Sequence, residues 1–176
     1  MMRKLLSNEL NRLSIDDFKK SEKVPIIVVL DNIRSLSNIG SAFRTADAFR
    51  IEAIYLCGIT AQPPHREIHK TALSATESVD WIYYDTTLEA IEHLKGSGFN
   101  IISVEQVDGS ILLNDFKTSS QEKYALIFGN EVKGVEDSII SMSDSCIEIP
   151  QWGTKHSFNV SVSIGIVLWD IVLKLK

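Results

Sequence analysis

The sequence predicts a single α/β domain with a mostly parallel sheet and helices on both faces. Short continuous apolar runs recur along the chain, as strands buried on both faces require. Segments with helically spaced apolar residues separate these runs, and such alternation is typical of parallel strands joined by helices. The length of 176 residues suits one domain with a sizeable core, and no internal repeat or linker divides it.

The first elements follow from capping and apolar spacing. Ser14 and Asp17 stand as in a capping box, which predicts a short helix before the core begins. Residues 25–30, PIIVVL, form an apolar run between a proline and an aspartate and predict a buried strand. Residues 37–49 are expected to form a helix, because their apolar residues share one face. These residues are Ile39, Ala42, Phe43, Ala46 and Phe49.

The same alternation continues to the C-terminus. A strand is expected over 53–58, then a segment over 60–75 that two prolines break before a helix resumes. A strand over 81–84 and a helix over 86–98 with a glycine stop come next. Further strands are expected over 99–105, 124–129 and 146–150, with a short helix near 136–141 and an apolar helix at the end of the chain.

Composition limits the class of protein. Cys57 and Cys146 stand alone in apolar, strand-like surroundings, which favours buried thiols in a reducing compartment over a disulfide framework. No apolar run is long enough for a membrane span, and the N-terminus lacks a signal-peptide pattern. The expected location is the cytoplasm. The net charge of −5 argues against indiscriminate nucleic-acid binding, but residues 1–23 carry six basic residues against four carboxylates and could form a local basic face.

Three loops after expected strands are unusually polar. They span residues 31–44, 129–137 and 150–159, and ligands bind beyond the carboxyl ends of strands in open parallel sheets. The second loop has two glycines five apart but lacks the Lys-Ser/Thr pair of a P-loop. The dinucleotide-binding glycine pattern and the serine-hydrolase elbow are also absent. His65 and His69 are spaced as a metal pair, yet no third ligand is suggested, so surface residues are favoured and no metal is expected.

Taken together and in this order, the loops resemble the three motifs of the SpoU/TrmH family of RNA ribose 2'-O-methyltransferases, in the SPOUT superfamily. DNIRSLSNIGSAFRTADAF resembles the first motif, ALIFGNEVKGV the second, and IEIPQWGTKHSFNVSVSIGIVLWD the third. The resemblance covers the chain from about residue 25 to its end. It implies a short basic helical extension over 1–24 and a SPOUT catalytic domain over 25–176. It also implies a C-terminal deep trefoil knot, which sequence physics does not predict because knots are rare.

The resemblance also implies site residues and partners. The expected cofactor is S-adenosylmethionine, the expected substrate is RNA, and the expected assembly is a homodimer. The implied catalytic residues are Arg44, Asn38, Glu131, Ser157 and Asn159. The implied cofactor-binding positions are Val104, Gly129, Asn130, Ile149, Pro150 and Phe158. Two residues depart from the family pattern: Phe158 replaces a leucine, and Arg50 stands where many relatives have a glycine.

The chemistry fits these residue types. Methyl transfer to a ribose 2'-OH requires an oriented oxygen and an anchored neighbouring phosphate, which the planar fork of Arg44 matches. Arginine is effectively never deprotonated, so a phosphate clamp is favoured over a base. Glu131 could orient Arg44 or Asn38. Asn38 and Ser157 could instead be helix N-caps, whereas Asn159, placed just inside the last helix, is easier to explain as a site residue.

The last helix is apolar on more than one face, which favours a subunit interface over burial within the monomer. The leading hypothesis is a methyltransferase acting on tRNA, with a D-loop guanosine as the narrower expectation. Ribosomal RNA is the second substrate. Two hypotheses from other functional classes are a non-catalytic RNA- or S-adenosylmethionine-binding module and a Rossmann-like oxidoreductase. The contributions of Trp152, Lys155 and His156 are left open.

Overall fold

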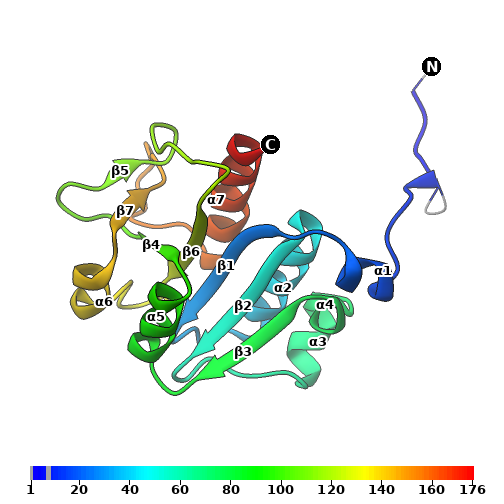
Figure 1. Cartoon of the computed structure of the whole chain (residues 1–176), viewed down its shortest axis with the longest axis horizontal. Coiled ribbons are helices and arrows are strands. Elements are labelled where there is room, and N and C mark those ends of the chain that lie inside the picture. The colour runs from blue at the N-terminus through cyan, green and yellow to red at the C-terminus, as the bar shows by residue number, and fades with distance from the viewer. Residues whose placement is uncertain (1, 7–8) are drawn as a thin grey trace.

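The computed structural model describes residues 2–6 and 9–176. Within these residues, seven strands form one sheet in the order β3-β2-β1-β6-β4-β7-β5, and each neighbouring pair is parallel (Figure 1). The strands are β1 (Val24–Asp31), β2 (Ile51–Cys57), β3 (Asp80–Tyr84), β4 (Phe99–Val104), β5 (Ile111–Leu112), β6 (Lys123–Phe128) and β7 (Ser145–Glu148). The helices are α1 (Ile15–Lys20), α2 (Leu36–Phe49), α3 (Arg66–Ala72), α4 (Ala75–Ser78), α5 (Thr87–Gly96), α6 (Asp137–Met142) and α7 (Val160–Leu175).

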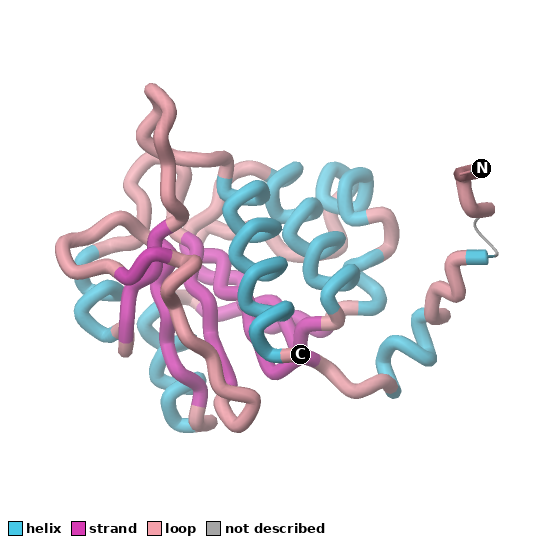
Figure 2. Tube along the Cα trace, turned by 90° about the horizontal axis from the view of Figure 1, so that it is seen from above, coloured by secondary structure: helices cyan, strands magenta, loops and turns pink. Residues whose placement is uncertain are grey.

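Helices cover both faces of the sheet, as the alternation predicts (Figure 2). Along β1, Ile26, Val28 and Leu30 enter one core cluster with α2, α3, α4 and α7. Ile27 and Val29 enter a second cluster with α5 and α6. Because successive side chains of a strand point to opposite faces, the continuous apolar run of β1 supplies both clusters.

The strand order brings the polar loops to one edge. β1, β6, β4 and β7 are consecutive in the sheet and parallel, so the segments that follow them begin side by side at their carboxyl ends. The first, second and third motif loops are among these segments. The knot implied by the resemblance is compatible with this order and stays a prediction.

The N-terminal segment is attached to the body through α1. Ser14 is the N-cap, and its hydroxyl accepts a hydrogen bond from the Asp17 N–H, as the capping-box prediction requires. Phe18 is buried in the first core cluster, whereas the described residues before α1 extend away from the body (Figure 1). The division of the chain at residue 24 stays a prediction.

Three details differ from the expectations. His65 does not lie within a helical turn: it is the N-cap of α3, and its Nδ1 accepts a hydrogen bond from the Glu67 N–H. β5 was not expected, because two residues are too few to give a recognisable apolar pattern. Cys57 is buried as expected, but Cys146 is only partly buried.

Candidate functional site

The second motif loop is closed on itself by hydrogen bonds. The Asn130 N–H donates to the Gly134 carbonyl at 3.1 Å, and the Gly134 N–H donates back to the Asn130 carbonyl at 2.8 Å. The Asn130 Oδ1 accepts from the N–H groups of Val132 and Lys133, while its Nδ2 donates to the carbonyl of Asn32 at 2.7 Å. Asn130 thus shapes its own loop and ties it to the end of β1.

Two glycines of this loop are required by close approach. A Cβ on Gly129 would lie 2.3 Å from the Gly134 carbonyl carbon and from the Val135 nitrogen. Gly134 has φ +69°, and a Cβ there would lie 2.2 Å from a carboxylate oxygen of Glu105. Glu105 follows β4 and accepts hydrogen bonds from the N–H groups of Val135 and Gln106 at 3.0 and 2.9 Å. This carboxylate therefore fixes the loop against β4.

Glu131 links the second motif to the first. Its carboxylate accepts hydrogen bonds from the N–H groups of Arg34 and Ser35, each at 3.3 Å, and from Asn38 Nδ2 at 3.2 Å. Partial burial alone raises the pKa of Glu131, but hydrogen bonds outweigh it and hold the pKa below its usual value. The donors are its own N–H, Arg34, Asn38 and Ser35. Glu131 is therefore a carboxylate that orients Asn38, one of the two partners expected for it.

Asn38 in turn reaches the third motif. Its Oδ1 accepts a hydrogen bond from Asn159 Nδ2 at 3.2 Å, which completes a chain from Glu131 through Asn38 to Asn159. All three motif loops thus meet through polar side chains. Sequence reasoning named these three residues, and the structure brings them together.

The helix caps correct one expectation. Asn159 is not inside the last helix but is the N-cap of α7, where its Oδ1 accepts from the Ser161 N–H. The cap of α2 is Ser35, whose hydroxyl accepts from the Asn38 N–H. Neither Asn38 nor Ser157 is an N-cap. Asn159 combines both functions, because its oxygen caps the helix while its amide group donates to Asn38.

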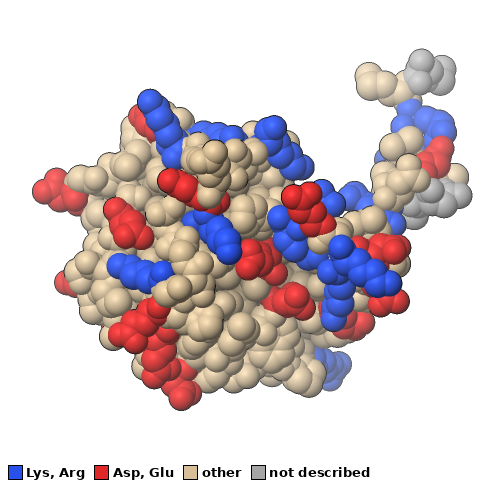
Figure 3. Space-filling view, viewed as in Figure 1, with Lys and Arg blue, Asp and Glu red and all other residues tan. Residues whose placement is uncertain are grey.

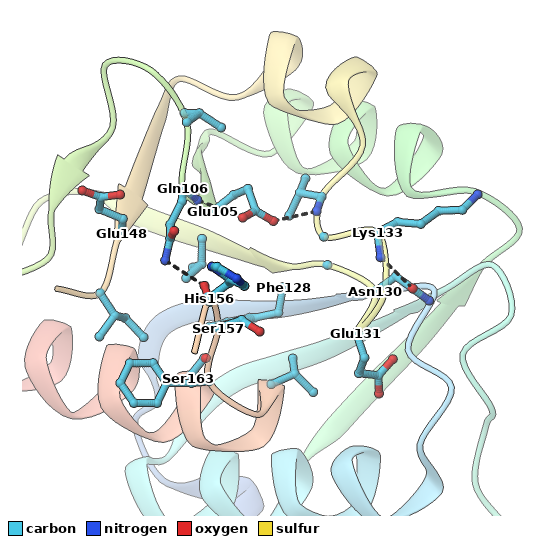
Figure 4. Close-up of a pocket in the computed structure, with 18 of the residues that line it drawn as sticks. Glu105, Gln106, Phe128, Asn130, Glu131, Lys133, Glu148, His156, Ser157 and Ser163 are labelled. Carbon is cyan, nitrogen blue, oxygen red and sulfur yellow. Dashed lines mark hydrogen bonds between the residues drawn. The ribbon is translucent and has the colours of Figure 1, made fainter. Parts of the chain in front are cut away.

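A cavity of about 730 Å³ lies among the loops after β4, β6 and β7 (Figure 4). Of the expected site residues, eight line it: Val104, Gly129, Asn130, Glu131, Ile149, Ser157, Phe158 and Asn159. Glu105, Gln106, Lys133, Glu148 and His156 also line it and are labelled in Figure 4. The sequence analysis named none of these five as site residues. Glu105 directly follows a strand at the binding edge, and that position was the one available signal for it.

Three expected site residues do not line the cavity. Asn38 is buried and is hydrogen-bonded to two residues that do line it, Glu131 and Asn159. Pro150 is partly buried in the loop after β7. Arg44 is exposed on α2, six residues after Asn38. It makes no ion pair with any described residue. The structure of one chain therefore does not bring Arg44 to the cavity.

Residues 2–6 and 9–176 show neither a metal-binding cluster nor a membrane-spanning helix. No group of three or more His, Cys, Asp or Glu side chains there is arranged to hold a metal ion. Over the same residues, no helix combines the length and apolar character needed to cross a bilayer.

The chain is similar to known RNA methyltransferases in sequence and in fold. An uncharacterized tRNA/rRNA methyltransferase of Borreliella burgdorferi is 34% identical over 165 residues, covering 92% of this chain and 69% of the relative. A tRNA (guanosine(18)-2'-O)-methyltransferase of Aquifex aeolicus is 28% identical over 169 residues, covering 94% of this chain and 76% of the relative. The structure of an AdoMet-bound rRNA methyltransferase from Sinorhizobium meliloti superposes with a TM-score of 0.81 at 23% identity, covering 90% of this chain and 60% of that one.

Other curated relatives are longer, and the chain spans about two thirds of their length. The model of the SpoU rRNA Methylase family matches residues 25–169, which include the strands β1 to β7 and all three motif loops. This match and the 34% identity over nearly the whole chain show that the protein belongs to the SpoU rRNA Methylase family.

Proposed function

We propose that the protein is an S-adenosylmethionine-dependent RNA ribose 2'-O-methyltransferase. The observation that carries the proposal is the hydrogen-bonded chain Glu131–Asn38–Asn159, which joins the three motif loops beside one cavity. The activities of the relatives, which include 2'-O-methylation of a tRNA guanosine, support the same chemistry.

The donor set of the cavity fits S-adenosylmethionine, a ligand with an adenine and two ribose hydroxyls. Among the described residues, no loop or side-chain hydrogen bond uses the backbone groups of Gly129, Ile149 or Phe158, so these remain available to a ligand. We assign cofactor binding to these three residues and to Val104 and Asn130. Pro150 contributes by supporting the loop after β7. When bound, the cofactor supplies an activated methyl group.

The residues of the chain would position the reacting groups. Glu131, held ionised by its donors, fixes the start of α2 and the amide of Asn38. Ser157 and Asn159 line the cavity, and we assign the ribose of the substrate nucleotide to these two residues. Preorganised polar groups of this kind lower the barrier because they need no reorientation during the reaction.

We assign Arg44 to a phosphate of the RNA, reached from the neighbouring subunit of a homodimer. The guanidinium offers a planar fork of donors and stays protonated, which suits a phosphate clamp rather than a base. Its exposure on α2, away from the cavity of its own chain, supports action on another site. The exposed apolar side chains of α7 supply a surface for the second copy. These are Val162, Trp169 and Leu173.

tRNA is the preferred substrate in this proposal, with a D-loop guanosine as the narrower assignment, because the IPQ-x-G motif resembles that branch and tRNA (guanosine(18)-2'-O)-methyltransferases are among the relatives. Ribosomal RNA is the alternative, supported by the similarity to 23S rRNA (guanosine-2'-O-)-methyltransferases. We assign the basic residues of the N-terminal segment to contacts with the phosphates of tRNA. Figure 3 shows Lys and Arg side chains gathered with some carboxylates where this segment meets the body.

The proposal is tested by incubating the protein with labelled S-adenosylmethionine and total RNA, then mapping the methylated nucleotide. We expect label on a ribose 2'-oxygen of tRNA. Label in ribosomal RNA would select the alternative substrate. Binding of cofactor or RNA with no incorporation into any fraction would contradict the enzymatic proposal and indicate a binding module.

A further inference from the structure

Trp152 is the most exposed large apolar side chain of the body, with 92% of its surface in contact with solvent. It lies in the loop between β7 and α7, next to Gln151, which lines the cavity. Folded chains bury most of the area of an indole, because that area is large and apolar. An indole left in water beside a ligand cavity therefore indicates a ring that a ligand or partner covers.

The loop that carries Trp152 is anchored near its end. The Gln106 side chain donates to the carbonyl of His156 at 3.3 Å (Figure 4), and Asn159 caps α7 while donating to Asn38. Trp152 therefore lies in a loop whose C-terminal part, at His156 and Asn159, is tied to the site. Its position depends on the same loop that forms the cavity wall.

The surroundings of the mouth combine exposed apolar groups with unpaired positive charge. Val132 and Phe158 line the cavity and remain 79% and 40% exposed. Arg34, Lys133 and Lys155 are exposed, and none of them forms an ion pair with another described residue. Lys133 lines the cavity together with Glu105, Glu131, Asp137 and Glu148, and the first two of these carboxylates already accept hydrogen bonds from backbone N–H groups. Lys155 stands three residues after Trp152 in the same loop. Single-stranded nucleic acids bind to such surfaces, through base stacking and phosphate contacts.

We propose that Trp152 stacks on an unpaired base of the RNA substrate, close to the nucleotide whose ribose is methylated. The inference rests on the proposed function and deepens it, because it specifies a nucleotide in a single-stranded loop. In a duplex the bases stack on each other, so no face is open to an indole, whereas loop bases can be splayed out. Arg34, Lys133 and Lys155 contact the flanking phosphates.

Binding can be measured without turnover. The chain has three tryptophans, so Trp81→Phe combined with Trp169→Phe leaves Trp152 as the one indole. This variant is titrated, without cofactor, with a single-stranded oligoribonucleotide and with the duplex formed with its complement. We expect the single strand to quench and shift the indole emission and the duplex to leave it nearly unchanged. Unchanged emission while the single strand binds, as measured by anisotropy of labelled RNA, would overturn the proposal.

Activity provides an independent test. Trp152→Ala is expected to raise the KM for RNA at least about 5-fold, from the known strength of base stacking, with kcat and the KM for cofactor nearly unchanged. Trp152→Phe should restore most of the affinity. Ile82→Ala, which truncates an exposed apolar residue on β3 at the far edge of the sheet, is the matched control and should leave the KM for RNA unaltered.

Two outcomes contradict the stacking proposal: an unchanged KM for RNA in Trp152→Ala, or dissociation of a dimer by this substitution in sedimentation velocity. The second would assign the ring to a subunit interface. If the wild-type protein methylates no RNA, the proposed function fails, while the fluorescence titration still decides whether Trp152 stacks on a base.

Discussion

Asp31 lies buried at the carboxyl end of β1, with 2% of its surface exposed. Thr87 Oγ1 and Asn32 Nδ2 both donate to its Oδ1. Burial raises the pKa of Asp31 in spite of these two donors, and the charge of Glu136 adds to the rise. The folded state therefore holds this proton more tightly than the unfolded chain. The contribution of Asp31 to stability is full below the unfolded pKa of about 3.9 and is lost as the pH rises through the folded pKa.

Asp31→Asn should consequently stabilise the protein at neutral pH. An asparagine can keep Oδ1 as the acceptor for Thr87 and Asn32 while removing the buried charge. The increase in the unfolding midpoint should grow from about pH 4 to pH 7, as measured by thermal denaturation across that range. The exposed Asp108→Asn is the control and should show no such trend. An equal gain at every pH would mean that packing, not charge, explains the effect.

The prediction of individual residues from the sequence succeeded where a side chain is tied to a motif and failed where its role depends on tertiary contacts. Glu131 and Asn38 belong to motifs, and they meet as expected. Asn32 and Thr60 received no role, yet Asn32 Oδ1 accepts from the Ile59 N–H and Thr60 Oγ1 donates to the Leu30 carbonyl. These bonds fix the end of β1 beneath the first motif. Their partners lie about thirty residues away, beyond the reach of local pattern.

The N-terminus of α7 combines a helix cap with a contact inside the site, and two substitutions of Asn159 can separate these functions. Asn159→Ala removes the cap and should cost about 1 kcal/mol of stability. Asn159→Asp keeps the capping oxygen and adds a charge that a helix N-terminus favours, but it loses the donor to Asn38. We expect Asn159→Asp to retain the unfolding midpoint in urea while methyl transfer falls by about tenfold. Full activity in Asn159→Asp would show that Asn159 is only a cap.

The backbone at the C-terminus of α2 favours glycine, which many relatives have where this chain has Arg50. Arg50 is the C-cap with φ 51° and ψ 45°, a left-handed conformation that costs a side-chain-bearing residue about 1–2 kcal/mol. Its carbonyl accepts the Val24 N–H at the start of β1, so the backbone is held in that conformation.

Arg50→Gly should raise the free energy of unfolding in urea by about 0.5–1 kcal/mol, after allowing for the greater freedom of glycine in the unfolded chain. Arg50→Ala is the matched control, because it removes the same side chain and keeps the strain. A gain in the alanine variant equal to that of glycine would attribute the effect to the arginine side chain.

Element boundaries were predictable wherever burial is continuous. The runs in β1 and β6 begin and end within about two residues of their expected limits, because both faces of these strands are covered. The start of α7 was wrongly placed, because Asn159 was expected inside the helix and is its N-cap. Apolar periodicity marks the buried face of a helix and not the residue that caps it. β5 is defined by its pairing with β7 and not by its own two residues.

A second copy of the chain would cover the apolar side chains that α7 leaves exposed in the monomer. Six side chains of α7 are buried in the monomer: Val160, Ile164, Val167, Leu168, Ile171 and Val172. Trp169 is nevertheless 59% exposed beside Phe49 of α2, and Val162 and Leu173 are also exposed. Sequence reasoning anticipated apolar groups on more than one face of this helix. The partner that covers them is a property of the assembly, which no single-chain pattern specifies.

The homodimer and the action of Arg44 across it can be tested together by complementation. Arg44→Ala lacks the proposed phosphate clamp, and Glu131→Ala lacks the carboxylate that orders the cavity loops. Each should be inactive alone, while cofactor affinity should be nearly unchanged in Arg44→Ala. A heterodimer of the two has one site with an intact cavity and an intact Arg44 from the other subunit.

Co-expression with two different tags should therefore restore about a quarter of wild-type activity for random pairing in a two-fold dimer. Pairing Arg44→Ala with the double variant Arg44→Ala/Glu131→Ala is the control and should restore none. A monomer in sedimentation velocity, or purified heterodimers without activity, would show that Arg44 does not act across a subunit interface.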